Sequence, residues 1–147
     1  RILLVEDEPN IIEAIRFILS RDGWHVGTHS EGTTALEAIR RGAPDVLVLD
    51  VMLPGRSGFD ILRDLRADEA MRDLPVLMLT AKGQGRDREQ AARCGVTRFM
   101  TKPFSNAEVL AAVNAMADAA RQPGADGEGD DPGGPPQVLR SSAGRDG

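Results

Sequence analysis

The stretch DVLVLDVML, residues 45–53, is too continuously apolar to have one face in water. A strand with one wet face would alternate apolar and polar residues. ILLV at 2–5 and LPVLMLT at 74–80 have the same character. Strands of this kind are typical of a parallel sheet that is covered by helices on both faces. The three stretches therefore predict the buried centre of such a sheet.

Helical patterns separate these strands. Apolar residues recur at helical spacing in five segments, which are 9–22, 31–41, 57–67, 87–94 and 105–120. Weaker strand patterns occur in WHVGTH, 24–29, and TRFMT, 97–101. Five strands that alternate with five helices predict an α/β fold with a doubly wound parallel sheet. We expect the flavodoxin-like order 2-1-3-4-5, with the mixed-polarity segment 24–29 at an edge.

Composition excludes several classes of function. The chain has 147 residues, a net charge of -5, no basic cluster, and only one tryptophan and four phenylalanines, so direct nucleic-acid binding is not expected. No apolar run approaches the roughly 20 residues that span a bilayer. Cys94 is the only cysteine, which rules out an internal disulfide and is typical of a cytoplasmic protein.

The amino-acid composition changes at Gln122. The stretch QPGADGEGDDPGGPP, 122–136, consists of glycine, proline and acids with almost nothing apolar. Such a segment buries too little surface to offset its ordering entropy. The sequence therefore predicts one domain over 1–121 and a disordered tail over 122–147.

Polar residues follow the predicted strands where each strand ends. Glu6 and Asp7 follow the first strand, Asp50 ends the third, Thr80 ends the fourth, and Lys102 follows the fifth. In a parallel sheet these ends share one edge, and ligands bind there at the point where the strand order reverses. We therefore expect the five side chains to meet in one pocket.

Three carboxylates in one pocket need an explanation. Two unit charges 4 Å apart repel by about 4 kcal/mol at an effective dielectric of 20, so either one carboxyl stays protonated or a cation lies between them. Carboxylate oxygens suit Mg²⁺, which we expect Asp7 to hold with help from Glu6. Asp50 is then a candidate nucleophile toward phosphorus. Lys102 would pair with the phosphoryl oxygens, and Thr80 would donate a hydrogen bond to them.

Each of these residues also has a simpler explanation. Asp7 and Glu8 precede a helix, where acids interact favourably with the helix dipole. Asp50 could begin a loop, Thr80 could be an ordinary strand-end hydroxyl, and Lys102 could be solvated. The combination of complementary groups at four strand ends favours a functional site.

The same residues carry a family resemblance. ILLVEDE, DVLVLDVMLPGRSGFD, PVLMLTA and FMTKPF occur in this order and at the expected separations. Over about residues 1–120 the chain resembles the receiver domain of two-component response regulators. The resemblance implies phosphorylation of Asp50 by a sensor histidine kinase or a His-containing phosphotransfer protein. It also implies that Asp7, Asp50 and the backbone carbonyl of Met52 bind Mg²⁺, with Glu6 contributing through water.

The resemblance further implies a conformational switch. It predicts a cis peptide between Lys102 and Pro103, and it places Phe99 at the position of the family's switch aromatic residue. Thr80 would move toward the phosphoryl group and Phe99 would turn inward. The surface formed by segments 87–94, 97–101 and 105–120 would then change shape and control a protein partner.

The output of this switch is open to more than one interpretation. Many receivers dimerise through that surface to bind DNA, using acids at the start of the fifth strand and an arginine in the last helix. This chain has Thr97, Arg98 and Ala112 there, and we expect no output domain in the segment after residue 121. We therefore expect a single-domain regulator that acts by protein contact, with an N-terminal fragment of a larger regulator as the alternative.

Two rival functions remain. A metal-dependent phosphatase with an aspartyl intermediate usually has a second aspartate two residues after the nucleophile, where this chain has Met52. A degenerate receiver would bind partners without phosphorylation. A nucleotide-binding enzyme is not indicated, because the chain has no GxGxxG or P-loop pattern. We expect no enzyme beyond a receiver that catalyses its own phosphotransfer and dephosphorylation.

Overall fold

The structure, a computed structural model, describes residues 1–81 and 85–121. The predicted disordered tail, 122–147, lies outside the described residues. Residues 1–116 form one compact unit, and the described part of a second unit is the last turn of the final helix with Arg121. The strands and helices are β1 (Ile2–Val5), α1 (Pro9–Arg21), β2 (Val26–His29), α2 (Ala35–Gly42), β3 (Val46–Asp50), α3 (Gly58–Ala67), β4 (Val76–Thr80), α4 (Gly85–Arg93), β5 (Arg98–Thr101) and α5 (Asn106–Ala120).

The five strands form one parallel sheet. Its order is β2-β1-β3-β4-β5, which confirms the predicted topology. In register, Val5 of β1 lies beside Leu49 of β3, and Asp50 lies beside Leu79 of β4. Every residue of β1, β3 and β4 is buried, whereas the edge strand β2 is half-buried or exposed.

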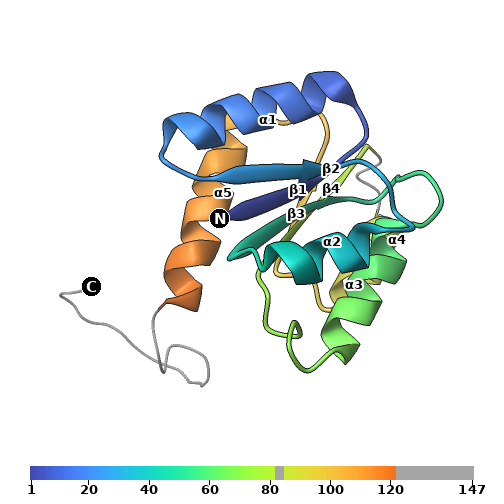
Figure 1. Cartoon of the computed structure of the whole chain (residues 1–147). Coiled ribbons are helices and arrows are strands. Elements are labelled where there is room, and N and C mark those ends of the chain that lie inside the picture. The colour runs from blue at the N-terminus through green and yellow to red at the C-terminus, as the bar shows by residue number, and fades with distance from the viewer. Residues whose placement is uncertain (82–84, 122–147) are drawn as a thin grey trace, which may run out of the picture. The chain divides into compact units, whose positions relative to one another are not determined.

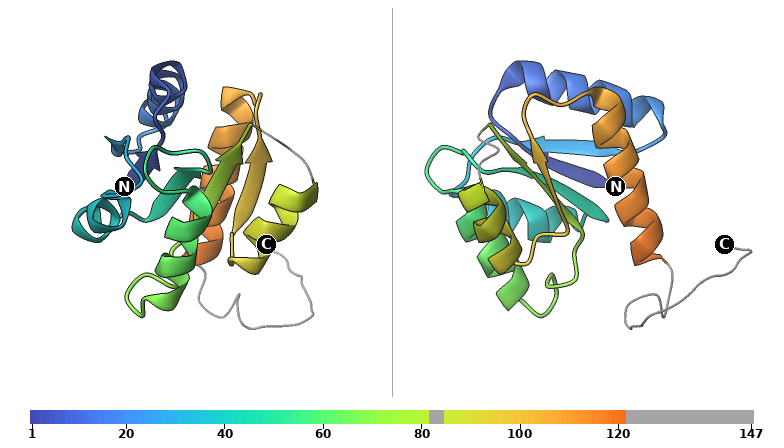
Figure 2. Two further views of the ribbon diagram at one scale, coloured as in Figure 1. Left: turned by 90° about the vertical axis from the view of Figure 1, so that its right-hand side faces the viewer. Right: turned by 180° about the vertical axis from the view of Figure 1, so that it is seen from behind.

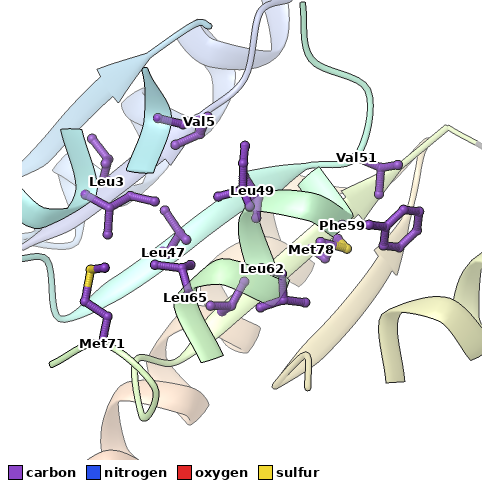
Figure 3. Close-up of a cluster of buried hydrophobic side chains, with 14 of the residues drawn as sticks. Leu3, Val5, Leu47, Leu49, Val51, Phe59, Leu62, Leu65, Met71 and Met78 are labelled. Carbon is purple, nitrogen blue, oxygen red and sulfur yellow. The ribbon is translucent and has the colours of Figure 1, made fainter. Parts of the chain in front are cut away.

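Helices cover both faces of the sheet. Within the first unit, α2, α3 and α4 lie on one side, and α1 lies on the other with α5 up to Met116 (Figures 1 and 2). Side chains alternate between the faces along each strand. Leu47 and Leu49 of β3 therefore pack toward α3, as Figure 3 shows with their neighbours. The labelled members of this cluster are Leu3, Val5, Leu47, Leu49, Val51, Phe59, Leu62, Leu65, Met71 and Met78.

Some predicted boundaries are wrong. The helix predicted from residue 31 begins only at Ala35, because residues 31–34 dock against the loop after β3. There the N–H of Gly32 donates to the carbonyl of Pro54 at 2.9 Å. A Cβ at Gly32 would lie 2.3 Å from the carbonyl oxygen of Arg56, so only glycine allows this approach.

The second predicted strand is too long at its start. β2 begins at Val26 rather than residue 24, because the N–H of Trp24 donates to Leu19 at the end of α1. β3 ends at Asp50, as predicted, and residues 51–53 of the apolar run lie beyond it. The carbonyl of Val51 accepts a hydrogen bond from the N–H of Gly58 at 2.9 Å, and this bond closes the loop between β3 and α3.

The start of α5 agrees with its sequence pattern, whereas α4 runs from Gly85 to Arg93 rather than over the predicted 87–94. Ser105 and Glu108 form a reciprocal capping box, in which each side chain accepts from the other residue's N–H, at 3.0 and 2.8 Å. The predicted cis peptide between Lys102 and Pro103 is confirmed. No helix in the described part of the chain combines the length and apolar character that crossing a membrane requires.

Gly58 brings α3 against the residue that ends β3. A Cβ at this position would lie 2.3 Å from the carbonyl oxygen of Asp50 and 3.0 Å from the Cα of Val51. Ser57 caps the same helix by accepting a hydrogen bond from the N–H of Asp60 at 3.3 Å. The backbone around Asp50 is therefore fixed by the start of α3.

We predict that Gly58→Ala lowers the free energy of unfolding by roughly 1–3 kcal/mol, since the backbone around Asp50 must shift to admit the methyl group. Gly42→Ala is the matched control, because a Cβ at Gly42 meets nothing within 4 Å. That change should leave stability equal or higher, as alanine favours the helix by up to about 1 kcal/mol. Chemical denaturation of both variants tests this, and equal stabilities would contradict it.

Candidate functional site

Three carboxylates meet at the carboxyl end of the sheet. Glu6 follows β1 and Asp50 ends the neighbouring strand β3, so the parallel register brings them side by side. Glu6, Asp7 and Asp50 each offer an oxygen, and these oxygens all lie within 4.8 Å of one another. Glu6 and Asp50 are almost fully buried, whereas Asp7 is exposed.

Lys102, which follows β5, lies against this cluster of carboxylates. Its Nζ lies 3.3 Å from Glu6 Oε1, 3.3 Å from Asp50 Oδ1 and 3.3 Å from Glu8 Oε1. The side chain of Lys102 is only 13% exposed, so its ammonium group is held mainly among carboxylates. Its backbone N–H donates to the carbonyl of Thr80 at 2.6 Å, which fixes the residue beside the end of β4.

Glu6 is held by the backbone that follows it. Its Oε2 accepts the N–H groups of Asp7 and Glu8, both at 3.1 Å. Its Oε1 is buried and accepts no hydrogen bond from the described residues, although it lies within ion-pair distance of Lys102. Glu6 therefore presents one fixed oxygen and one oxygen available to a further partner.

Burial dominates the electrostatics of this cluster. It raises the pKa of Glu6 to about 7, and the nearby charge of Asp50 adds to the effect. Burial likewise raises the pKa of Asp50, although the charge of Lys102 opposes the shift. For Lys102 burial lowers the pKa, but the charges of Asp50 and Glu6 outweigh it and the net pKa is raised. The lysine is thus protonated beside two carboxyls that resist ionisation together.

Thr80 and Phe99 both contact α4. Thr80, which ends β4, is buried, and its Oγ1 donates to Asp87 Oδ2 at 3.4 Å. Phe99 in β5 is half-buried, and the guanidinium carbon of Arg88 lies 5.3 Å from the centre of its ring. Consecutive residues of one helix therefore contact the two residues predicted to move.

An open groove adjoins the exposed side of the cluster. It has a volume of about 770 Å³ and is lined by Asp7, by Met52 and by the loop from 53 to 57 with Asp60. The side chain of Met52 is 65% exposed. A reactant from solution therefore has a route toward Asp7 and the end of β3.

Sequence reasoning missed three contacting residues. It attributed Glu8 to the helix start, but the Glu8 carboxylate lies at Lys102. The acidic run of Glu6 to Glu8 was the available signal. Asp87 and Arg88 had no comparable signal, because their contacts depend on how α4 packs against β4 and β5.

Comparisons with known proteins indicate the family of this chain. A sequence profile described as "Response regulator receiver domain" matches residues 2–114. The probable transcriptional regulatory protein TcrX of Mycobacterium tuberculosis is 44% identical over 115 residues, which are 78% of this chain and 48% of TcrX. The phosphate regulon transcriptional regulatory protein PhoB of Escherichia coli is 38% identical over 116 residues, which are 79% of this chain and 51% of PhoB. The chain thus spans about half the length of these relatives.

Solved structures show the same fold. The receiver domain of a sensor histidine kinase from Pseudomonas aeruginosa, with a magnesium ion coordinated in its active site cleft, has a TM-score of 0.73 and 32% identity. The match covers 80% of this chain and 96% of that one. The profile, the relatives and the fold agree, and this chain belongs to the response regulator receiver domain family.

Proposed function

We propose that this domain is a Mg²⁺-dependent phosphoacceptor whose Asp50 takes a phosphoryl group from a sensor histidine kinase or a His-containing phosphotransfer protein. Response regulators are generally signalling proteins rather than enzymes. The observation that carries the proposal is the ammonium group of Lys102, 3.3 Å from Asp50 and 3.3 Å from Glu6. This arrangement sets a nucleophile and a cation side by side in a buried place.

The proposed transfer is a displacement at phosphorus. A carboxylate oxygen of Asp50 forms the bond to phosphorus, while the bond from phosphorus to the donor's imidazole nitrogen breaks. The electron pair of that bond stays on the imidazole, which takes up a proton. Lys102 neutralises the oxygens of the transferred group, and the Thr80 hydroxyl donates to one of them.

The donor set of the acidic cluster suits a hard divalent cation. Three carboxylate oxygens lie within 4.8 Å of one another, and Glu6 Oε1 accepts no hydrogen bond among the described residues. We propose that Asp7, Asp50 and the carbonyl of Met52 bind Mg²⁺, with Glu6 acting through water. When bound, Mg²⁺ neutralises charge on the carboxylates and on the phosphoryl oxygens.

The proposed output is a change at α4, β5 and α5. Thr80 would leave Asp87 for the phosphoryl group, and Phe99 would turn away from Arg88. A phosphoryl group adds about -1.5 to -2 charges at Asp50, which supplies the difference in interaction between the two states. The altered surface would control a protein partner.

We further propose a domain boundary at residue 121 with a tail after it, a cytoplasmic location and output by protein contact. TcrX and PhoB are named as transcriptional regulatory proteins. Thr97, Arg98 and Ala112 favour output through protein contact over the DNA-binding subtype, and a fragment of a larger regulator remains the alternative.

We predict that acetyl phosphate with Mg²⁺ places one phosphoryl group on the protein and that Asp50→Asn abolishes this labelling. The label should be released by hydroxylamine, as expected for an acyl phosphate. Asp45→Asn is the matched control, because Asp45 is exposed and flanks the opposite end of β3. Intact-protein mass spectrometry measures the label.

Three outcomes would redirect the proposal. Labelling that survives Asp50→Asn would refute the assignment. An unlabelled wild-type protein would favour the degenerate receiver. Repeated turnover of a small phosphomonoester would favour the phosphatase.

We predict that Mg²⁺ raises the melting temperature of the protein and that Asp7→Asn removes most of this rise. A ligand at a hundred times its dissociation constant stabilises the folded state by about 2.7 kcal/mol. The same Asp45→Asn variant should retain the full Mg²⁺ response. An unchanged response in Asp7→Asn would show that the cation binds elsewhere.

The raised pKa of Glu6 predicts a pH dependence of stability without metal. Its pKa is about 7 in the folded state against 4.5 for an ordinary glutamate, so its contribution is full below pH 4.5 and is lost as the pH rises through 7. In buffer with a chelator, the wild-type protein should therefore lose stability against Glu6→Gln between these pH values. Parallel denaturation series measure the difference, and a difference independent of pH would contradict the prediction.

A further inference from the structure

We propose that Glu8 is a positioning residue that holds Lys102 in the unphosphorylated state and competes with the phosphoryl group for it. The inference rests on the proposed phosphoacceptor function and adds a residue that determines how readily the site accepts an anion. It comes from the contacts of Glu8, which the position of this acid at a helix start does not explain.

The side chain of Glu8 does not cap α1. Glu8 is the N-cap residue, yet within the described chain its side chain makes no capping hydrogen bond. Its carboxylate instead accepts from Lys102 Nζ at 3.3 Å. The contact joins residues 94 positions apart in the sequence, so it depends on the fold and not on local helix chemistry.

The backbone of Glu8 is fixed while its carboxylate is not. Its N–H donates to Glu6 Oε2 at 3.1 Å, and its carbonyl accepts from Ile12 at 3.0 Å. The side chain, however, is 61% exposed. The carboxylate can therefore leave Lys102 for solvent without disturbing the start of α1.

The contacts of the Lys102 ammonium group explain why the mobility of the Glu8 carboxylate matters for phosphoryl binding. Three carboxylates lie 3.3 Å from Nζ, and the ammonium group donates hydrogen bonds to two of them, Glu8 Oε1 and Asp50 Oδ1. A phosphoryl oxygen that approaches Nζ competes with these carboxylates for the ammonium group. Asp50 carries the phosphoryl group itself, and Glu6 is fully buried and held by two backbone N–H groups. Glu8 is therefore the carboxylate that can move away from Lys102 when a phosphoryl oxygen binds there.

Removing the charge of Glu8 should therefore favour anion binding. The contact between Glu8 and Lys102 is partly exposed, and such ion pairs contribute little to stability. Glu8→Gln should accordingly raise the affinity for a phosphoryl analogue by roughly two- to fivefold. The substitution keeps the size of the side chain and removes only its charge.

The experiment is a beryllofluoride titration at saturating Mg²⁺, read by ¹⁹F NMR, of the wild type, Glu8→Gln and Glu13→Gln. Beryllofluoride is a stable anionic analogue of the phosphoryl group. Glu13 is an exposed acid on α1, so its variant makes the same change in net charge away from Lys102. The initial rate of labelling by acetyl phosphate should rise in Glu8→Gln by a similar factor.

The expected result is tighter binding in Glu8→Gln than in Glu13→Gln. Damage to the fold would weaken binding, so a gain cannot arise from a merely structural role of Glu8. Equal affinities in the two variants, or weaker binding in Glu8→Gln, would overturn the proposal while leaving the phosphoacceptor function intact. A wild-type protein that neither binds beryllofluoride nor takes a label would refute both.

Discussion

The ion pairs of Lys102 with Glu6 and Asp50 are the interaction on which this site depends. Two carboxyls that are almost fully buried would repel each other and lose hydration, and removing their cation would leave charge buried without a partner. Lys102 lies 3.3 Å from both and is itself mostly buried. The protein thus keeps the carboxyl of Asp50 buried by holding an ammonium group against it.

The parallel sheet makes this arrangement possible. β1, β3, β4 and β5 all point the same way, so residues that follow their ends share one edge although they are up to about a hundred positions apart in sequence. The apolar strands supply rigidity, and the start of α3 fixes the backbone of Asp50 through Gly58. The positions of the polar side chains at this edge are therefore fixed by close packing in the apolar layers next to it.

The sequence predicted the sheet order because unbroken apolar strands and strand-end polar residues are local patterns. It also predicted that Glu6, Asp7 and Asp50 come together and that Lys102 lies beside them. The late start of α2 was not predictable, because it depends on the close approach of Gly32 to Arg56. The contact of Glu8 with Lys102 was missed for the same reason: a helix start explains an acid without reference to distant residues.

The neighbouring positions of Asp87 and Arg88 have a consequence for signalling. These two residues contact the hydroxyl of Thr80 and the ring of Phe99, so one turn of α4 contacts both the end of β4 and the strand β5. Under the proposed function, a molecule that binds this turn of α4 alters the contacts with Thr80 and with Phe99 at the same time. Thermodynamic linkage then requires reciprocity: whatever the phosphoryl group does to the affinity for that molecule, the molecule does equally to the stability of the phosphoryl group on Asp50. A partner bound at α4 would thus both respond to the phosphorylation of Asp50 and change the stability of the phosphoryl group.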